Sequence, residues 1–497
     1  MYNTEQGVIN VPEGAVQTRP RLVDRLDPNL VNVLTALGFG LPIAGYFWIV
    51  ARYSVNVILD DQWGDVTVIK ASHSHVIPWG VLWAQWNENR MFFPRLIVIV
   101  LARAVHFNIQ VEEYLSAIML LGATALLIWC HKRRSRQTPW LYYCPVAFLS
   151  FSLVQYGNTL WGFQMAWYLV LLSLAVALVF LDRTTLTWLV LFGAIGAGVV
   201  GSFSSLQGLL IWPAGLVLLY HRRRGVLFIA SWVAAGVATV LFYFQNFNVH
   251  SGAPFPNYAW QHPIAAIKFY LFLVGDIVGE SVKFGQGNNY VILFGFVIVI
   301  LAAAPLVIYG IYRDEIGGSP IGMALICFGL LFAVTVTQGR IIFGYSIGAS
   351  ASRYTTYDLM ILVGIYLALL GRPPLLAGPR LTAARKIGRT AWERYSGRRR
   401  IESGSVRSIV ERVLPATRLL VIAIVVVQIV FAISNGLTGI RSTHQTQEHD
   451  AHVLRDFHHS PGAAELLDLF APERVFQEQA STAQRLHLSL FARPPAR

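Results

Sequence analysis

The chain alternates long apolar runs with short polar segments from residue 31 to residue 433. A helix needs about 20 predominantly apolar residues to cross the hydrocarbon core of a bilayer, and many of these runs approach that length. Hydrophobic residues make up 55% of the 497 residues and charged residues 13%, whereas soluble domains carry about 25% charged residues. The pattern predicts an all-α, polytopic transmembrane helical bundle in a cell membrane of the bacterial inner or plasma membrane type.

Basic tracts between the apolar runs predict how the chain is threaded. The net charge is +13, and many Lys and Arg residues gather in tracts such as 131–136, 221–224 and 371–418. Tracts of this kind mark cytoplasmic loops, so they do not indicate a nucleic-acid partner. Placing each long tract inside gives about eleven spans, a cytoplasmic N-terminus and an extracytoplasmic C-terminus. The expected spans are 31–50, 113–130, 140–154, 163–181, 186–200, 209–220, 227–244, 290–312, 323–336, 359–370 and 419–433.

The apolar run from residue 91 to residue 105 is expected to lie at the membrane surface rather than to cross. It carries Arg95 and Arg103 eight positions apart, which places both on one helical face. A charge at mid-bilayer costs about 2.5–3.5 kcal/mol on insertion scales. A crossing here would also push the basic tract 131–136 to the outside, against the positive-inside rule. A second surface helix is expected over 264–278.

The predicted organisation has five parts. These are a cytoplasmic N-terminal tail (1–30), a transmembrane catalytic bundle (31–370) with amphipathic juxtamembrane helices in an external loop (53–112), a basic cytoplasmic loop (371–418), a last span (419–433) and an external C-terminal tail (434–497).

The densest group of polar side chains follows the first span and begins with Asp60 and Asp61. A carboxylate outside the membrane can act as the general base for a hydroxyl nucleophile. Neighbouring residues on a helix point about 100° apart, so we expect only one of the two to face a site. The alternative is that the pair caps a helix end in water. We take Asp60 and Asp61 as the candidate catalytic residues.

Several arginines are expected on the same outer side. Arg90, Arg95 or Arg103 could hold a phosphate, because guanidinium forks match phosphate oxygens. Binding of lipid headgroups or snorkelling explains Arg95 equally well and Arg103 better. Arg340 and Arg353 lie where the positive-inside rule disfavours Arg. Either an anionic lipid-linked substrate or an ion pair with one of the early aspartates would explain them.

Amides and aromatic side chains complete the candidate site. They suit a sugar, because amides bind hydroxyls and aromatic rings cover a sugar face, although helix ends and an interfacial aromatic belt explain some of them equally well. His73 and His75 lie two apart, which is a weak metal pattern, and we predict no metal site. The remaining candidate substrate-binding residues are His73, Asn87, Glu88, Asn158, Trp161, Gln164 and Tyr354.

This layout resembles the GT-C-type integral membrane glycosyltransferases, in an uncharacterised bacterial branch. The resemblance covers residues 31–370 at the level of topology and rests on Asp60 and Asp61 at the level of residues. The segments 86–90 and 352–354 look like motifs of bacterial members of this group. The chain lacks the large C-terminal soluble domain and the Trp-Trp-Asp motif of the oligosaccharyltransferases, so transfer to an Asn sequon is not expected.

The resemblance implies an inverting transfer on the extracytoplasmic face, within membrane lipid. The donor would be a polyprenyl-phosphate-linked sugar and the acceptor a glycan, lipid or protein. Asp60 or Asp61 would deprotonate the acceptor hydroxyl, and Arg353 with Arg90 would stabilise the polyprenyl phosphate that leaves. No cofactor is implied, and a divalent metal requirement is left open.

Two other classes of protein fit parts of the pattern. A lipid-linked polysaccharide polymerase or ligase also uses outward-facing arginines, but it takes a lipid-diphosphate donor and does not need the aspartate pair. A lipid or solute transporter normally shows charges near the middle of the membrane and often two related halves. The sequence shows no such halves, and Lys268 and Asp276 are the exceptions to a scarcity of charges inside the spans.

Overall fold

The computed structural model describes residues 26–73, 78–248, 258–279, 289–312, 320–370, 403–459, 462–467, 469 and 472–492. These residues form an assembly of helices, with one two-stranded hairpin among them, and the predicted helical fold class is confirmed. Among the described residues, seven helical segments are long and apolar enough to cross a membrane. They correspond to all or part of α1 (Pro28–Tyr53), α5 (Ile109–Lys132), α8 (Met165–Leu181), α11 (Val226–Tyr243), α15 (Asn289–Tyr312), α16 (Pro320–Arg340) and α19 (Ser403–Arg455).

Shorter helices and two short strands complete the described fold. Three of them are apolar, namely α9 (Trp188–Ser202), α10 (Ile211–His221) and α17 (Thr355–Leu370). The first loop holds η2 (Asp60–Gln62), α2 (Trp63–Ser72), α3 (Trp79–Trp83), β1 (Gln85–Trp86), β2 (Asn89–Arg90) and α4 (Phe92–Val105). Later short elements include α7 (Tyr156–Thr159), η5 (Gly162–Gln164), α12 (Tyr258–Gln261), α13 (Pro263–Gly275), η7 (Asp276–Val278), η10 (Ser352–Tyr354), α20 (Ala463–Leu466), α21 (Glu473–Arg485) and η13 (Ser489–Phe491).

The predicted count of about eleven spans is not confirmed. The run 140–154, expected as one span, is divided into η3 (Trp140–Tyr143), α6 (Cys144–Ser150) and η4 (Leu153–Gln155). Pro145 lies at the start of α6, where its missing N–H is not needed. Seven residues of α-helix rise only about 10 Å, too little to cross a bilayer.

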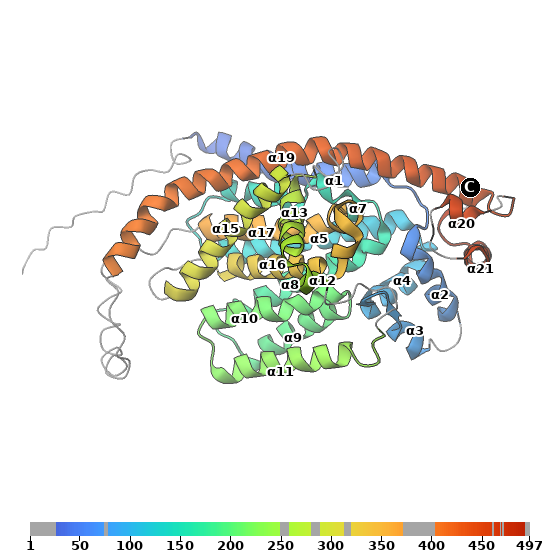
Figure 1. The fold of residues 1–497 in the computed structure, drawn as a ribbon, viewed down its shortest axis with the longest axis horizontal. Coiled ribbons are helices and arrows are strands. Elements are labelled where there is room, and N and C mark those ends of the chain that lie inside the picture. Colours follow the sequence, from blue (N-terminus) through green and yellow to red (C-terminus); the bar gives the residue numbers. More distant parts are fainter. Residues whose placement is uncertain are drawn as a thin grey trace, which may run out of the picture.

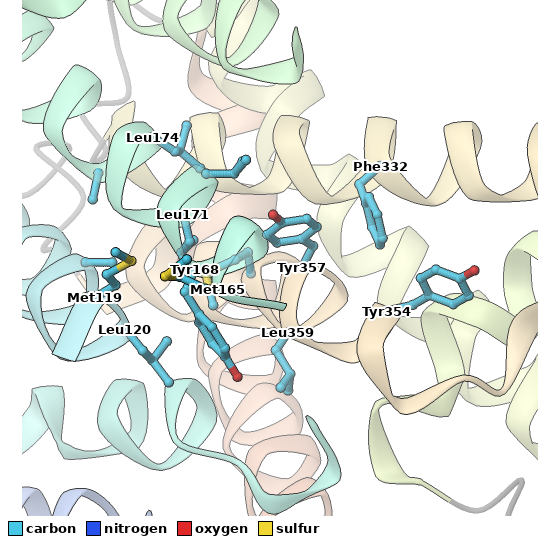
Figure 2. Packing of buried hydrophobic residues seen from close by; sticks show 14 of the residues in the cluster. Met119, Leu120, Met165, Tyr168, Leu171, Leu174, Phe332, Tyr354, Tyr357 and Leu359 are labelled. Carbon is cyan, nitrogen blue, oxygen red and sulfur yellow. The ribbon is translucent and has the colours of Figure 1, made fainter. Parts of the chain in front are cut away.

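Aromatic side chains from the middle of the chain pack against one another in the interior of the bundle. Tyr357 of α17 is fully buried and stacks on Trp167 of α8 with ring centroids 4.7 Å apart. Phe332 of α16 meets the Tyr357 ring edge-on at 4.9 Å. Figure 2 shows these side chains of α16 and α17 beside Tyr354, and a second group of buried side chains around Tyr168. The packing places Tyr354, and with it the neighbouring Arg353, on a rigid support.

Three of the polar segments between helices meet at the side chain of Asp182. The carboxylate of Asp182, which follows α8, accepts hydrogen bonds from Arg133 and Arg134 at 3.0 and 3.1 Å and from Arg222 at 2.8 Å. Segments that sequence analysis assigned to one side of the membrane are thus joined by one buried carboxylate.

The C-terminal part does not follow the predicted boundaries. Helix α19 begins within the predicted basic loop, continues past residue 433 and ends at Arg455. It runs along the bundle in Figure 1, and the chain after it brings α21 beside α2. Phe476 of α21 packs edge-on against Trp63 at 5.3 Å, and Lys70 pairs with Glu478 at 3.3 Å. The predicted external tail therefore folds onto the first loop.

Candidate functional site

The two aspartates after α1 face different neighbours. Asp60 has a φ of +40°, an uncommon value for a residue other than glycine, and its side chain is exposed. Its charge acts on Asp450 of α19. Asp61 is half-buried and instead approaches the β1–β2 hairpin. The two carboxyl groups therefore have different surroundings.

The carboxyl group of Asp61 lies in a mixed polar environment. Burial raises its pKa above the ordinary value, while the side chains of Trp86 and Asn87 and the charge of Arg353 act to lower it, and Glu88 raises it. The indole Nε1 of Trp86 makes no hydrogen bond of ordinary geometry within the described residues. A carboxylate with a raised pKa is a stronger base, which suits proton abstraction near neutral pH.

The β1–β2 hairpin presents two candidate residues at its turn. Gln85 pairs with Arg90 and Trp86 with Asn89, which leaves Asn87 and Glu88 at the tip. Asn87 has a φ of +48°, in the left-handed region that Asn tolerates better than most residues. Glu88 Oε1 accepts a hydrogen bond from Arg340 Nη2 at 2.7 Å.

The position of this hairpin next to η2 depends on a glycine. A Cβ atom at Gly64 would come within 2.5 Å of the Trp86 ring, so the ring lies directly on the first turn of α2. The contact joins the hairpin to the segment that carries Asp61.

The contacts of Arg90 differ from those expected of a phosphate-binding residue. Its side chain is buried and donates to the backbone carbonyls of Trp83 at 2.8 Å, Tyr243 at 3.2 Å and Gln245 at 2.7 Å. Its guanidinium also lies 5.2 Å from the Trp83 ring centroid. Arg95 is buried as well, and within the described residues its guanidinium donates to backbone carbonyls before the hairpin. These contacts make both arginines supports of the first loop, with few donors left for a phosphate.

Arg353 keeps most of its donors available. Within the described residues, its guanidinium makes one hydrogen bond, of 3.4 Å to the Tyr354 hydroxyl, and lies 5.1 Å from that ring's centroid. The backbone of Arg353 is held by Asn158, whose Nδ2 donates at 2.7 Å to the Arg353 carbonyl and to Thr356 Oγ1. Asn158 is fully buried. It positions Arg353 in this structure instead of lining an open surface.

Trp161 and Gln164 lie near the acidic segment. The Trp161 ring stacks on Phe163 with centroids 5.6 Å apart, and its Nε1 has no hydrogen-bond partner among the described residues. Gln164 is buried, and its Oε1 is unpartnered in the same sense. Buried polar atoms of this kind nearly always bind water or another group.

Two acidic residues near Asp61 were missed as candidates. Glu112 accepts a hydrogen bond from Gln62 Nε2 at 2.6 Å, although both side chains are buried. Asp65 is also buried, and burial raises its pKa to about 7, against the lowering effect of Arg95. Asp65 falls inside the acidic stretch and Glu112 follows α4, but composition alone could not show that these two side chains are buried.

His73 lies at the end of α2, where its side chain is exposed and its Nδ1 contacts the Ile69 carbonyl at 2.9 Å. His75 lies outside the described residues. Within the described ranges, no three His, Cys, Asp or Glu side chains are grouped as metal ligands would be.

The structure thus brings part of the predicted site together. Asp61 lies close enough to Arg353 and Glu88 for their charges to act on its carboxyl group, and Glu88 binds Arg340. These residues come from the first loop and from the ends of α16 and α17. No protein-family model, curated protein or solved structure matches this chain.

Proposed function

We propose that this protein is a membrane glycosyltransferase that moves a sugar from a polyprenyl-phosphate donor to an acceptor hydroxyl at the extracytoplasmic face. One observation carries the proposal. A half-buried carboxyl group with a raised pKa, Asp61, lies under the influence of Arg353, whose guanidinium has few protein partners in the described part of the chain. A base beside an available cation is what an attack at a sugar phosphate requires.

In the proposed reaction, the Asp61 carboxylate takes the proton of the acceptor hydroxyl. The hydroxyl oxygen then bonds to the anomeric carbon while the bond from that carbon to the phosphate oxygen breaks, which inverts the anomeric centre. Polyprenyl phosphate leaves with the bonding electron pair, and Arg353 balances its charge. Loss of one preorganised donor to a developing anion costs about 2.7–4 kcal/mol in well-studied enzymes.

Asp60 and Asp61 provide a matched pair for the test. We expect Asp61→Asn to abolish transfer from a radiolabelled polyprenyl-phosphate sugar in proteoliposomes, because an amide cannot accept the hydroxyl proton. We expect Asp60→Asn to retain most of the activity, because this side chain is exposed and its charge acts on Asp450 of α19. Both variants should elute as the wild type does on size exclusion. Wild-type transfer rates in a folded Asp61→Asn protein would rule out the proposed base.

A proton-coupled transporter is the second candidate, and one observation favours it. Asp276 and Asp358 are 2% and 1% exposed inside the bundle. Ionisable residues buried within membrane segments often mark ion or proton pathways. Proton-driven uptake of a lipid or solute by proteoliposomes, without sugar transfer, would favour this candidate over the transferase.

A further inference from the structure

Asp358 lies in the first turn of α17, five residues after Arg353. Its side chain is 1% exposed, and neither carboxyl oxygen has a hydrogen-bond partner among the described residues. Burying an ionised carboxylate without a partner is so costly that such a group normally takes up a proton instead. The position therefore needs a ligand, and a proton is the smallest that satisfies it.

A second buried carboxyl group lies on η7, an element that packs against α17. Asp276 lies where α13 ends and the single 3-10 turn η7 begins, and it is 2% exposed. Its charge acts on Asp358. Helix α13 also packs against α17, and the charge of Asp358 acts on its Tyr270. The Tyr270 hydroxyl donates to the Leu330 carbonyl at 3.5 Å. Two neighbouring carboxyl groups do not readily ionise together.

Asp182 shows how this chain stabilises a buried carboxylate when the charge is kept. It is fully buried like Asp358, but three guanidinium groups bind its two oxygens. The described surroundings of Asp358 offer no such cation. The two sites therefore differ in chemistry and not in burial.

We propose that Asp358 and Asp276 form a proton-binding site inside the helical bundle, with the proton carried by Asp358. The proposal does not depend on the transferase activity. The site is joined to the segment that carries Arg353 by two routes. One is the continuous chain from η10 into α17, and the other is Tyr156, which interacts with both Ser352 and Asp276.

Infrared difference spectroscopy of the reconstituted protein tests the proposal directly. A protonated carboxyl group has a C=O stretching band that is separate from the carboxylate bands and shifts in deuterium oxide. At neutral pH we expect Asp358→Asn to remove one such band from the wild-type spectrum. Glu478→Gln is the control, because this carboxylate is exposed and paired with Lys70. We expect it to leave the band unchanged.

A second variant covers the case in which Asp358→Asn does not fold. Asp358→Glu keeps the acid, so the band should shift in frequency without disappearing. If the band is the same in the wild type and in a folded Asp358→Asn protein, or does not respond to Asp358→Glu, Asp358 is not protonated and the proposal is wrong.

Discussion

The buried Asp182 offers the most direct test of how the helices are held together. Its Oδ2 accepts from Arg133 at 3.0 Å and Arg134 at 3.1 Å, and its Oδ1 accepts from Arg222 at 2.8 Å. The Asp182 side chain is fully buried, whereas those of the three arginines are 21–27% exposed. Asp182→Asn keeps the size of the side chain but removes its charge and one acceptor oxygen.

The expected loss in the free energy of unfolding follows from the difference in exposure between Asp182 and its arginine partners. Removing one partner of a buried ion pair typically costs about 3–5 kcal/mol, because the other charge is left buried and unbalanced. The arginines here can recover some hydration, since about a quarter of each side chain reaches the surface. We therefore expect the lower end of that range, about 3 kcal/mol. This corresponds to roughly a hundredfold change in the unfolding equilibrium.

The assay is reversible unfolding in mixed detergent micelles, followed by circular dichroism as the fraction of denaturing detergent rises. Glu478→Gln is the matched control, because its ion pair with Lys70 joins side chains that are 72% and 53% exposed. Exposed pairs of this kind contribute about 0–1 kcal/mol. A loss below about 1 kcal/mol for Asp182→Asn would refute the argument that this carboxylate joins the three basic segments.

Two further predictions concern Arg353 and Asp65. Arg353→Ala should weaken the binding of polyprenyl monophosphate at least tenfold, measured by native mass spectrometry, with little change in melting temperature, because its guanidinium has few described protein partners. A loss confined to stability would indicate a structural role. For Asp65, burial raises the pKa from 3.8 to about 7, so the folded protein holds a proton that the unfolded chain has lost between these values. Stability should therefore fall as pH rises from about 4 to 7, and Asp65→Asn should reduce this slope in pH-dependent unfolding. An unchanged slope would contradict the assignment.

Local sequence patterns predicted the membrane helices better than their ends. Runs such as 113–130 and 163–181 correspond to α5 and α8, because long apolar segments without breakers satisfy their own backbone only as helices. The run 140–154 failed because hydropathy does not register that a proline can begin a new, shorter helix. The end of α19 was also missed. Its polar half is held by distant contacts, such as Asn435 Nδ2 to the Val278 carbonyl at 2.9 Å.

In the candidate site too, the sequence predicted some features and the folded structure decided others. Sequence analysis selected Asp61 and Arg353 from their residue types and their expected side of the membrane. It could not separate Asp61 from Asp60, because the difference lies in a backbone turn at Asp60. It also assigned a substrate role to Arg90, whose donors go to carbonyls about 150 residues away in the chain.

The sequence by itself determined that this chain is a bundle of apolar helices with a polar first loop, because hydrophobicity and helical length are local properties. The tertiary structure alone decided which charges meet. It placed Asp61 near Arg353, enclosed Asp182 within three arginines and left Asp358 beside Asp276. The energy of a charge depends on its burial and its neighbours, and those are set by packing between segments far apart in the chain.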